Sequence, residues 1–113
     1  MNKPTTLDIL VRAKELLNEP NVYIKHMLYN GCGGFCAIGA LYQVNAERNG
    51  QELSMQLPYT PELGVAQTLL TKHSPDRSVV KTNNNRDLNA VNEMFCGAIK
   101  EEVSNTHGTS EAA

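Results

Sequence analysis

The stretch "NGCGGFCAIGAL" at residues 30–41 decides the fold, because a turn rich in glycine and cysteine leads here directly into an apolar helical pattern. Apolar residues after Cys36 recur at helical spacing, which predicts a central helix that begins at this cysteine. Asn49-Gly50 would end it with the left-handed residue that closes many helices. Gly39 lies inside this helix and makes it less stable by about 1 kcal/mol relative to alanine. A glycine at such a position usually allows another backbone to approach closely, and we expect such an approach here.

A first helix precedes this stretch. Thr5 and Asp8 have the spacing of a capping box, in which each side chain accepts a backbone amide at the helix start. Pro20 disfavours helix in the residue before it, so this helix ends near Asn18. Its apolar residues share one helix face: Ile9, Leu10, Ala13, Leu16 and Leu17.

Two further helices follow the central one. Thr60 before Pro61 is a strong helix start, and Ser74 with the proline after it ends that helix. Asp87 or Asn89 would cap the last helix. The apolar residues of these two helices recur at helical spacing: Leu63, Ala66, Leu69 and Leu70, then Leu88, Val91, Phe95, Ile99 and Val103.

Between and after the helices the pattern is less regular. Residues 21–34 favour an extended segment packed on the core, and Val79-Val80 a short strand before an asparagine-rich turn. Residues 104–113 are small, polar and without pattern, which predicts a disordered tail. We therefore predict a mainly α fold, a compact four-helix single domain over residues 1–103 with one or two short strands.

Composition limits the classes of function. The 113 residues carry a net charge of −2, without the broad basic face that a general nucleic-acid or membrane-surface binder needs. No apolar run reaches the roughly 20 residues that span a bilayer. Three cysteines without the spacing of a disulfide framework favour free thiols and a cytoplasmic location. We expect a partner protein instead, and a homo-oligomer stays open.

Cys36 is the candidate nucleophile. At a helix start the backbone amides and the helix dipole lower the pKa of a thiol. His73 or His26 would then serve as the general base of a thiol enzyme of the hydrolase type. In the simpler interpretation, which we favour, the cysteine is a small buried residue, since free cysteine is among the most buried residue types.

A zinc site is a weaker alternative. His26, Cys32, Cys36 and Cys96 would supply four ligands of the kind that zinc prefers. However, the spacing Cys-x₃-Cys matches zinc sites only loosely, and Cys96 lies on the face of the last helix where core residues recur. We therefore predict no metal and no cofactor.

The turn before the central helix is a candidate anion site. Gly31, Gly33 and Gly34 would let backbone amides approach a phosphate or carboxylate along Gly31–Phe35. The turn is too short for a nucleotide-binding fingerprint. A tight turn that aligns a core helix explains the same glycines, and we favour this interpretation.

A second candidate surface is the basic stretch "KHSPDRSVVKTNNNR" at residues 72–86. Within it, Lys81 and Arg86 supply positive charge, and the amides of Asn83 and Asn84 suit a polar or anionic ligand. Basic residues near a helix end and asparagines in a turn are also ordinary features of folded chains. We favour this ordinary interpretation over a ligand site.

Two segments, "CAIGAL" at 36–41 and "VVKTNNNRDLNAVNEMFCGAI" at 79–99, resemble an uncharacterised family of small bacterial and phage proteins. In that family a Cys-x-x-Gly-Ala-Leu helix precedes an extended Trp-Asn-Asp segment and a final amphipathic helix. Asn83 matches the central residue of the second motif, whereas Thr82 stands in place of its tryptophan and Asn84 in place of its aspartate. The resemblance implies this order of elements and a phage or mobile-element origin, but no activity.

The residues supply no complete catalytic set. We therefore expect a small non-catalytic accessory protein of prokaryotic or phage type, which binds a partner macromolecule through an exposed face. A thiol enzyme that uses Cys36 is the first alternative. Binding of a small anionic or nucleotide ligand at the glycine turn is the second.

Overall fold

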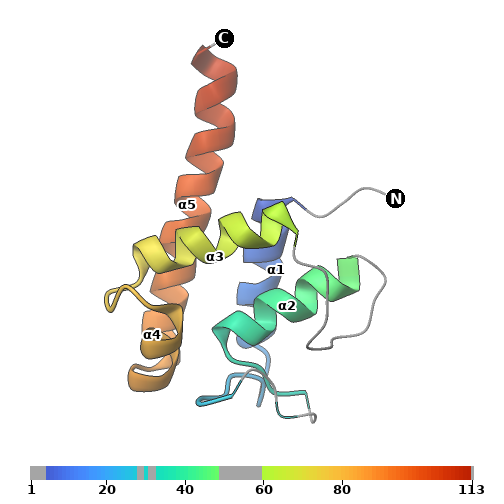
Figure 1. The fold of residues 1–113 in the computed structure, drawn as a ribbon, viewed down its shortest axis with the longest axis vertical. Helices are drawn as coiled ribbons and strands as arrows, with labels where there is room; N and C mark the ends of the chain where they lie inside the picture. Colours follow the sequence, from blue (N-terminus) through green and yellow to red (C-terminus); the bar gives the residue numbers. More distant parts are fainter. Residues whose placement is uncertain (1–4, 28–29, 31–32, 49–59, 113) are drawn as a thin grey trace.

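Helices make up most of the chain. The computed structural model describes residues 5–27, 30, 33–48 and 60–112. Five helices follow one another in the order α1 (Thr6–Leu17), α2 (Ala37–Arg48), α3 (Pro61–His73), α4 (Val79–Asn85) and α5 (Leu88–Ala112) (Figure 1). The predicted mainly α single domain is confirmed, with one more helix than expected in the described part. None of these helices combines the length and the apolar character needed to cross a membrane.

The helices begin at the residues that the sequence marks as caps. Thr5 accepts the amide of Asp8 at 3.0 Å, and the Asp8 carboxylate accepts the amide of Thr5 at 3.4 Å, which completes the predicted capping box of α1. The side chain of Thr60 caps α3, and that of Asp87 accepts a backbone amide in the first turn of α5. The predictions of these helix starts are therefore confirmed.

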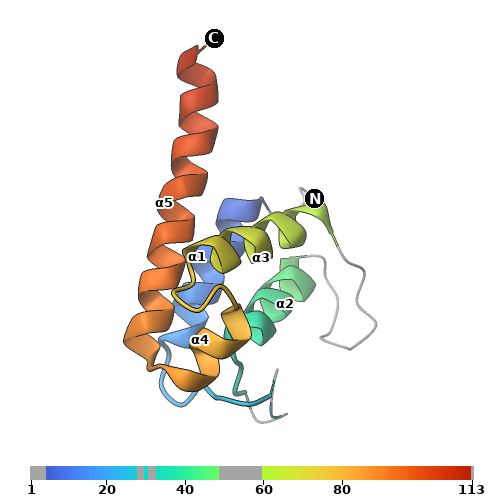
Figure 2. The same cartoon turned by 60° about the vertical axis from the view of Figure 1, so that its left-hand side comes forward.

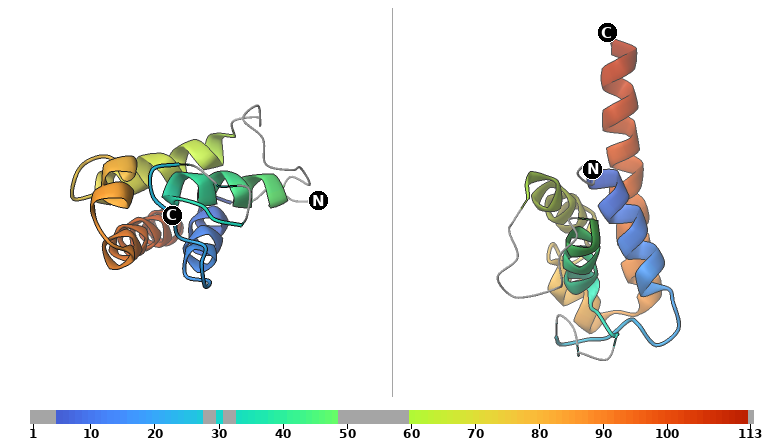
Figure 3. Two further views of the ribbon diagram at one scale, coloured as in Figure 1. Left: turned by 90° about the horizontal axis from the view of Figure 1, so that it is seen from below. Right: turned by 90° about the vertical axis from the view of Figure 1, so that its right-hand side faces the viewer.

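The helices form two layers. α1 and α5 lie side by side and run in opposite directions, as the right-hand view of Figure 3 shows. α2 and α3 lie next to each other in the second layer and cross over this pair (Figures 1 and 3). Short α4 joins the lower end of α5 and contacts α2 and α3 as well (Figure 2).

The core lies between the two layers. It contains the apolar faces that the helical spacing predicts in α1 and α3, and it includes Phe95 as its largest fully buried side chain. The following residues from the four longer helices contribute to it: Ile9, Leu10, Ala13, Leu16 and Leu17; Ala37, Ala40, Leu41 and Val44; Leu63, Ala66, Leu69 and Leu70; Val91, Met94, Phe95 and Ala98.

α4 stands where a strand and an asparagine-rich turn were predicted, and that prediction is wrong. Ser78 caps this helix by accepting the amide of Lys81 at 3.3 Å. The buried residues of α4 are Val79, Thr82 and Asn83, which have helical spacing, but two of them are polar. An amphipathic helix is recognised in a sequence by the spacing of its apolar residues. Because two of the three buried residues are polar, this helix could not be recognised from the sequence.

The segment between α1 and α2 contains one short pairing. Tyr23 and Phe35 form an isolated parallel bridge. It is held by hydrogen bonds from the Ile24 amide to the Phe35 carbonyl at 3.1 Å and from the Phe35 amide to the Val22 carbonyl at 2.7 Å. Val22 is buried and Tyr23 packs against the core. Only the part around Tyr23 agrees with the extended, core-packed segment that was predicted for residues 21–34, because Lys25, His26 and Met27 are exposed and His26 has a positive φ.

α5 continues beyond the rest of the molecule. Its C-terminal half projects past the other helices (Figure 1) and includes residues 104–112, for which the sequence predicts a disordered tail. One other prediction, the cap at Asn49-Gly50, lies outside the described residues.

Candidate functional site

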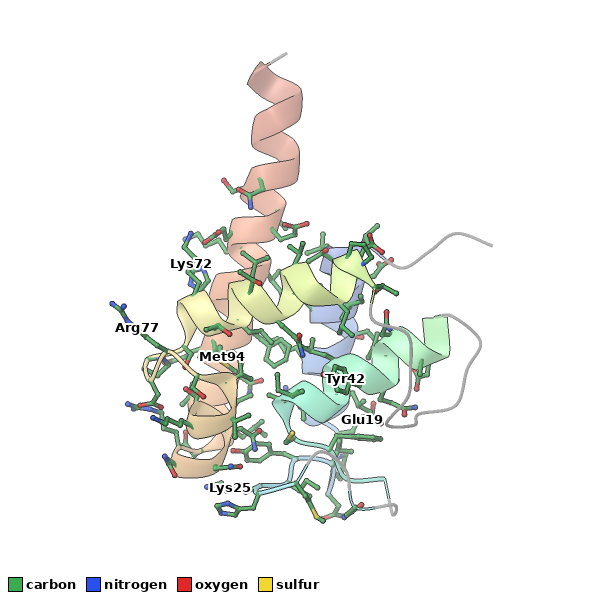
Figure 4. The ribbon with its side chains drawn as sticks, in the orientation of Figure 1. Glu19, Lys25, Tyr42, Lys72, Arg77 and Met94 are labelled. Carbon is green, nitrogen blue, oxygen red and sulfur yellow. The ribbon has the colours of Figure 1, made fainter. Side chains whose placement is uncertain are left out.

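A surface pocket of about 250 Å³ lies where the segment after α1 meets the start of α2 and one side of α4. It brings together four residues that the sequence singled out, Cys36, His26, Asn83 and Asn84, from three separate parts of the chain. The described residues that line it are His26, Met27, Cys36, Ile38, Val80, Asn83 and Asn84. Figure 4 shows the side chains of this lower part of the molecule, with Lys25 labelled near its edge.

Cys36 acts as a cap at the start of α2. Its side chain is almost fully buried, with 7% of the residue exposed. The sulfur accepts the backbone amide of Gly39, three residues on, at 3.4 Å, as an N-cap hydroxyl would. Burial raises the pKa of the Cys36 thiol, and the hydrogen bond from Gly39 opposes this only in part. The thiol is therefore protonated at neutral pH, which counts against an activated nucleophile.

His26 reaches the pocket through a left-handed backbone. Its φ is 69°, a region that residues other than glycine seldom adopt. The backbone amide of His26 donates to Oδ1 of Asn84 at 2.7 Å, which helps to hold this conformation. The His26 side chain is exposed, and the structure gives its imidazole no hydrogen bond to Cys36.

Asn83 joins three parts of the structure through one buried amide. Only 1% of the residue is exposed. Its Oδ1 accepts the amide of Ala37 at the first position of α2, at 2.9 Å. Its Nδ2 donates to the carbonyl of Ile24 at 3.0 Å and to Oδ1 of Asn84 at 3.2 Å. The side chain therefore has a structural role, since its oxygen and both amide hydrogens are used inside the protein.

Asn84 is a lining residue whose side-chain amide has a free donor. Its Oδ1 accepts from the amide of His26 and from Nδ2 of Asn83. Because two donors meet this oxygen, the orientation of the amide is fixed. Its Nδ2 has no hydrogen-bond partner in the part of the chain that the structure describes, and the residue is half-buried. Asn84 can therefore offer one hydrogen-bond donor to a ligand in the pocket.

The glycine turn is explained by backbone geometry. Gly33 has a φ of 89°, which only glycine adopts readily. Gly34 is buried, and a Cβ there would lie 2.7 Å from Nδ2 of Asn30. The α2 amides that would hold an anion have internal acceptors: Asn83 Oδ1 for Ala37 and Cys36 Sγ for Gly39. The geometry favours a structural turn, while Gly31 and Cys32 lie outside the described residues.

His73 lies away from the pocket, at the C-terminal end of α3. Its Nε2 is 2.8 Å from Oε1 of Glu101 on α5, and Nζ of Lys72 is 3.0 Å from Oε2 of the same carboxylate. The ring packs on Gly97, where a Cβ would come within 2.6 Å of Nδ1. Hydrogen bonds from Lys72 first, and then from His73, lower the pKa of Glu101. His73 therefore ties α3 to α5 and does not line the Cys36 pocket.

The two basic residues singled out near α4 differ in their surroundings. Arg86 makes a bidentate contact with Asp76, with Nε 2.8 Å from Oδ2 and Nη2 3.2 Å from Oδ1. This contact lowers the pKa of Asp76. Lys81 is exposed and forms no ion pair with any described residue. Of the two, Lys81 has its charge available for a partner.

The described residues do not form a set of metal ligands. Within that part of the chain, no three histidine, cysteine or acidic side chains are placed to hold an ion. Cys96 is exposed on α5, whereas Cys36 is buried beside α4. Cys96 was expected on the core face of its helix, and that expectation is wrong.

Sequence reasoning missed the apolar residues of the pocket. Met27 and Val80 are each 53% exposed and line it together with Ile38. In the sequence, Val80 next to Val79 suggested a strand, and nothing marked Met27. A helical interpretation of 79–85 would have placed Val80 on the side of α4 opposite the buried Thr82.

Comparisons of the chain with protein-family models, with curated proteins and with solved structures found no match. The resemblance of residues 36–41 and 79–99 to a family of small bacterial and phage proteins therefore stays a prediction. The structure does give those two segments a physical connection, because Asn83 in the second accepts the amide of Ala37 in the first.

Proposed function

We propose that this chain is a small non-catalytic accessory protein, of the prokaryotic or phage type that the resemblance implies, and that it binds a partner protein at the pocket beside α4. The supporting observation is where its apolar surface lies. Four large hydrophobic side chains are exposed among the described residues, and the two most exposed, Met27 and Val80, both line this pocket. Apolar side chains that gather at a hollow on a surface are typical of an interaction site.

The size of the pocket favours a side chain as its occupant. Pockets for cofactors and drug-sized ligands usually measure about 300–1,000 Å³, whereas this one measures about 250 Å³. Its walls carry one free amide donor, on Asn84, beside apolar groups from Met27, Ile38 and Val80. Such a pocket suits one apolar side chain of a partner, whose backbone carbonyl accepts the hydrogen bond from Asn84.

The experiment is a selection from a phage-displayed library of random peptides on the intact chain. We expect selected peptides to lose roughly tenfold or more in affinity for Val80→Asp, because a carboxylate at the rim places charge against the apolar side chain. The matched control is Val65→Asp on α3, where the valine is 45% exposed and does not line the pocket. Circular dichroism checks that both variants are folded.

Two outcomes would contradict the proposal. One is a selection that yields no peptide whose binding depends on Val80. The other is an equal loss of affinity in Val80→Asp and Val65→Asp, which would mean that the effect is not local to the pocket.

A thiol enzyme is the second candidate function. The observation in its favour is that Cys36, His26 and Asn84 line the same pocket. Iodoacetamide labelling across pH tests it in a Cys32→Ser/Cys96→Ser background, where Cys36 is the remaining cysteine. We expect slow labelling that rises only above the usual thiol pKa of about 8.5, because burial raises the pKa of this thiol. Rapid labelling at neutral pH would instead favour the enzyme.

A further inference from the structure

We infer that the partner segment which binds the pocket is acidic, with carboxylates on either side of one apolar anchor residue. This inference rests on the proposed function and names the chemistry of its partner. It follows from the charges around the pocket, which are positive in a chain whose net charge is −2.

Two exposed lysines are sequence neighbours of lining residues on two different elements. Lys25 directly precedes His26, and Figure 4 shows it at the edge of the molecule below α4. Lys81 directly follows Val80 and lies three residues before Asn84, so it shares the exposed side of α4 with them. Both lysines are exposed, and neither forms an ion pair with a described residue.

The nearby carboxylates are bound mainly by other groups, and Asp76 interacts with Lys81 only through its charge, without an ion-pair contact. Asp76 is held by Arg86 and also accepts a hydrogen bond from Thr82 at 3.1 Å. Asp87 accepts the amide of Ala90 at the start of α5. None of the described residues that line the pocket is acidic. A partner that approaches it therefore meets lysine charges and the free amide donor of Asn84, all of which prefer an acceptor or an anion.

An acidic peptide fits this surface better than a nucleic acid. Among the described residues, the pocket walls are mainly apolar and include no aromatic side chain on which a base would stack. Polyanion binding also needs a longer row of basic residues than two lysines provide. An apolar side chain between two carboxylates would fill the pocket and meet both lysines.

The selection from the random-peptide library tests this inference through the sequences it yields. We expect Asp and Glu to be enriched on both sides of an apolar residue. Affinity for the selected peptides should fall roughly two- to fivefold in Lys81→Glu, the range for exposed ion pairs, and the loss should shrink at about 0.5 M salt. Lys100→Glu on α5, the same change at an exposed lysine outside the pocket, should leave affinity unchanged.

The outcomes separate the inference from the proposed function. Peptides that need Val80 but are neutral or basic, and that ignore Lys81→Glu, would overturn the inference and leave the proposed function standing. Binding of a single-stranded oligonucleotide that is lost in Lys81→Glu but kept in Val80→Asp would overturn the inference in favour of a polyanion. The absence of any peptide that depends on Val80 would overturn both.

Discussion

Cys36 occupies at α2 the position that a threonine or serine occupies at α1, α3 and α4. A thiol sulfur accepts a hydrogen bond more weakly than a hydroxyl oxygen does. The thiol is less polar than a hydroxyl, however, and so suits a buried position better. The residue therefore caps the helix and fills a place in the core. Burial raises the pKa of its thiol, and the capping hydrogen bond from Gly39 opposes this only in part.

Substitutions at Cys36 distinguish a cap from a space-filling residue. We expect Cys36→Ser to be more stable than Cys36→Ala by about 1 kcal/mol, because the hydroxyl retains an acceptor for the Gly39 amide. Urea unfolding of the two variants measures the difference. If the alanine variant is as stable as the serine variant, the sulfur only fills space.

Asn83 is a buried polar residue whose loss should destabilise the fold strongly. Asn83→Ala leaves the amide of Ala37 and the carbonyl of Ile24 without their partner at a buried position. We expect the free energy of unfolding to fall by roughly 2–5 kcal/mol, since each unpaired buried group costs about 1–3 kcal/mol. Exposed Asn85→Ala on the same helix is the control and should change stability by less than about 0.5 kcal/mol. A similar loss in both variants would show that the effect belongs to the helix and not to this amide.

At the scale of elements, α3 and α5 are joined by a polar contact that sits on a glycine. His73 packs over Gly97 and meets Glu101, which Lys72 also contacts. His73 was among the candidate bases for Cys36, because the sequence alone gives no information about where the ring of a histidine points. Gly97 lies one helical turn before Glu101, and a glycine inside a helix often marks a close approach by another element. The sequence does not say which element approaches, because that depends on the packing of α3 against α5.

This contact should make stability depend on pH in the acid range. The folded pKa of Glu101 is lower than its unfolded value, so its contribution is present above the unfolded pKa of about 4.3 and is lost as pH falls through the folded pKa. We expect the gap in unfolding free energy between the wild-type chain and Glu101→Gln to close over that window. Glu93→Gln, at an exposed glutamate on the same helix, should show no such closing gap. A gap that stays constant with pH would contradict the ion-pair interpretation.

For the whole molecule, the helices with apolar faces and hydroxyl caps could be predicted from sequence, and α4 could not. Thr5, Asp8 and Thr60 are local signals, because each cap bonds a residue three positions away. The buried polar residues of α4 depend instead on distant partners: Thr82 on Ser74 and Asp76, and Asn83 on Ile24 and Ala37. The pocket was missed for the same reason, since its walls come together only in the folded chain.

The projecting end of α5 gives a prediction at this scale. Its backbone leaves the two layers of helices (Figure 1), so a chain that ends at Asn105 should keep the fold. We expect its free energy of unfolding to match that of the full chain within about 0.5 kcal/mol. A larger loss in urea unfolding would show that residues beyond Asn105 support the core.

The hydrogen bond between Asn83 and the first amide of α2 spans 46 residues of sequence. During synthesis, the residues around Cys36 leave the ribosome well before α4, so the hollow beside α4 cannot form on a chain that stops before this helix. A partner that binds this hollow would therefore not bind nascent chains that still lack α4.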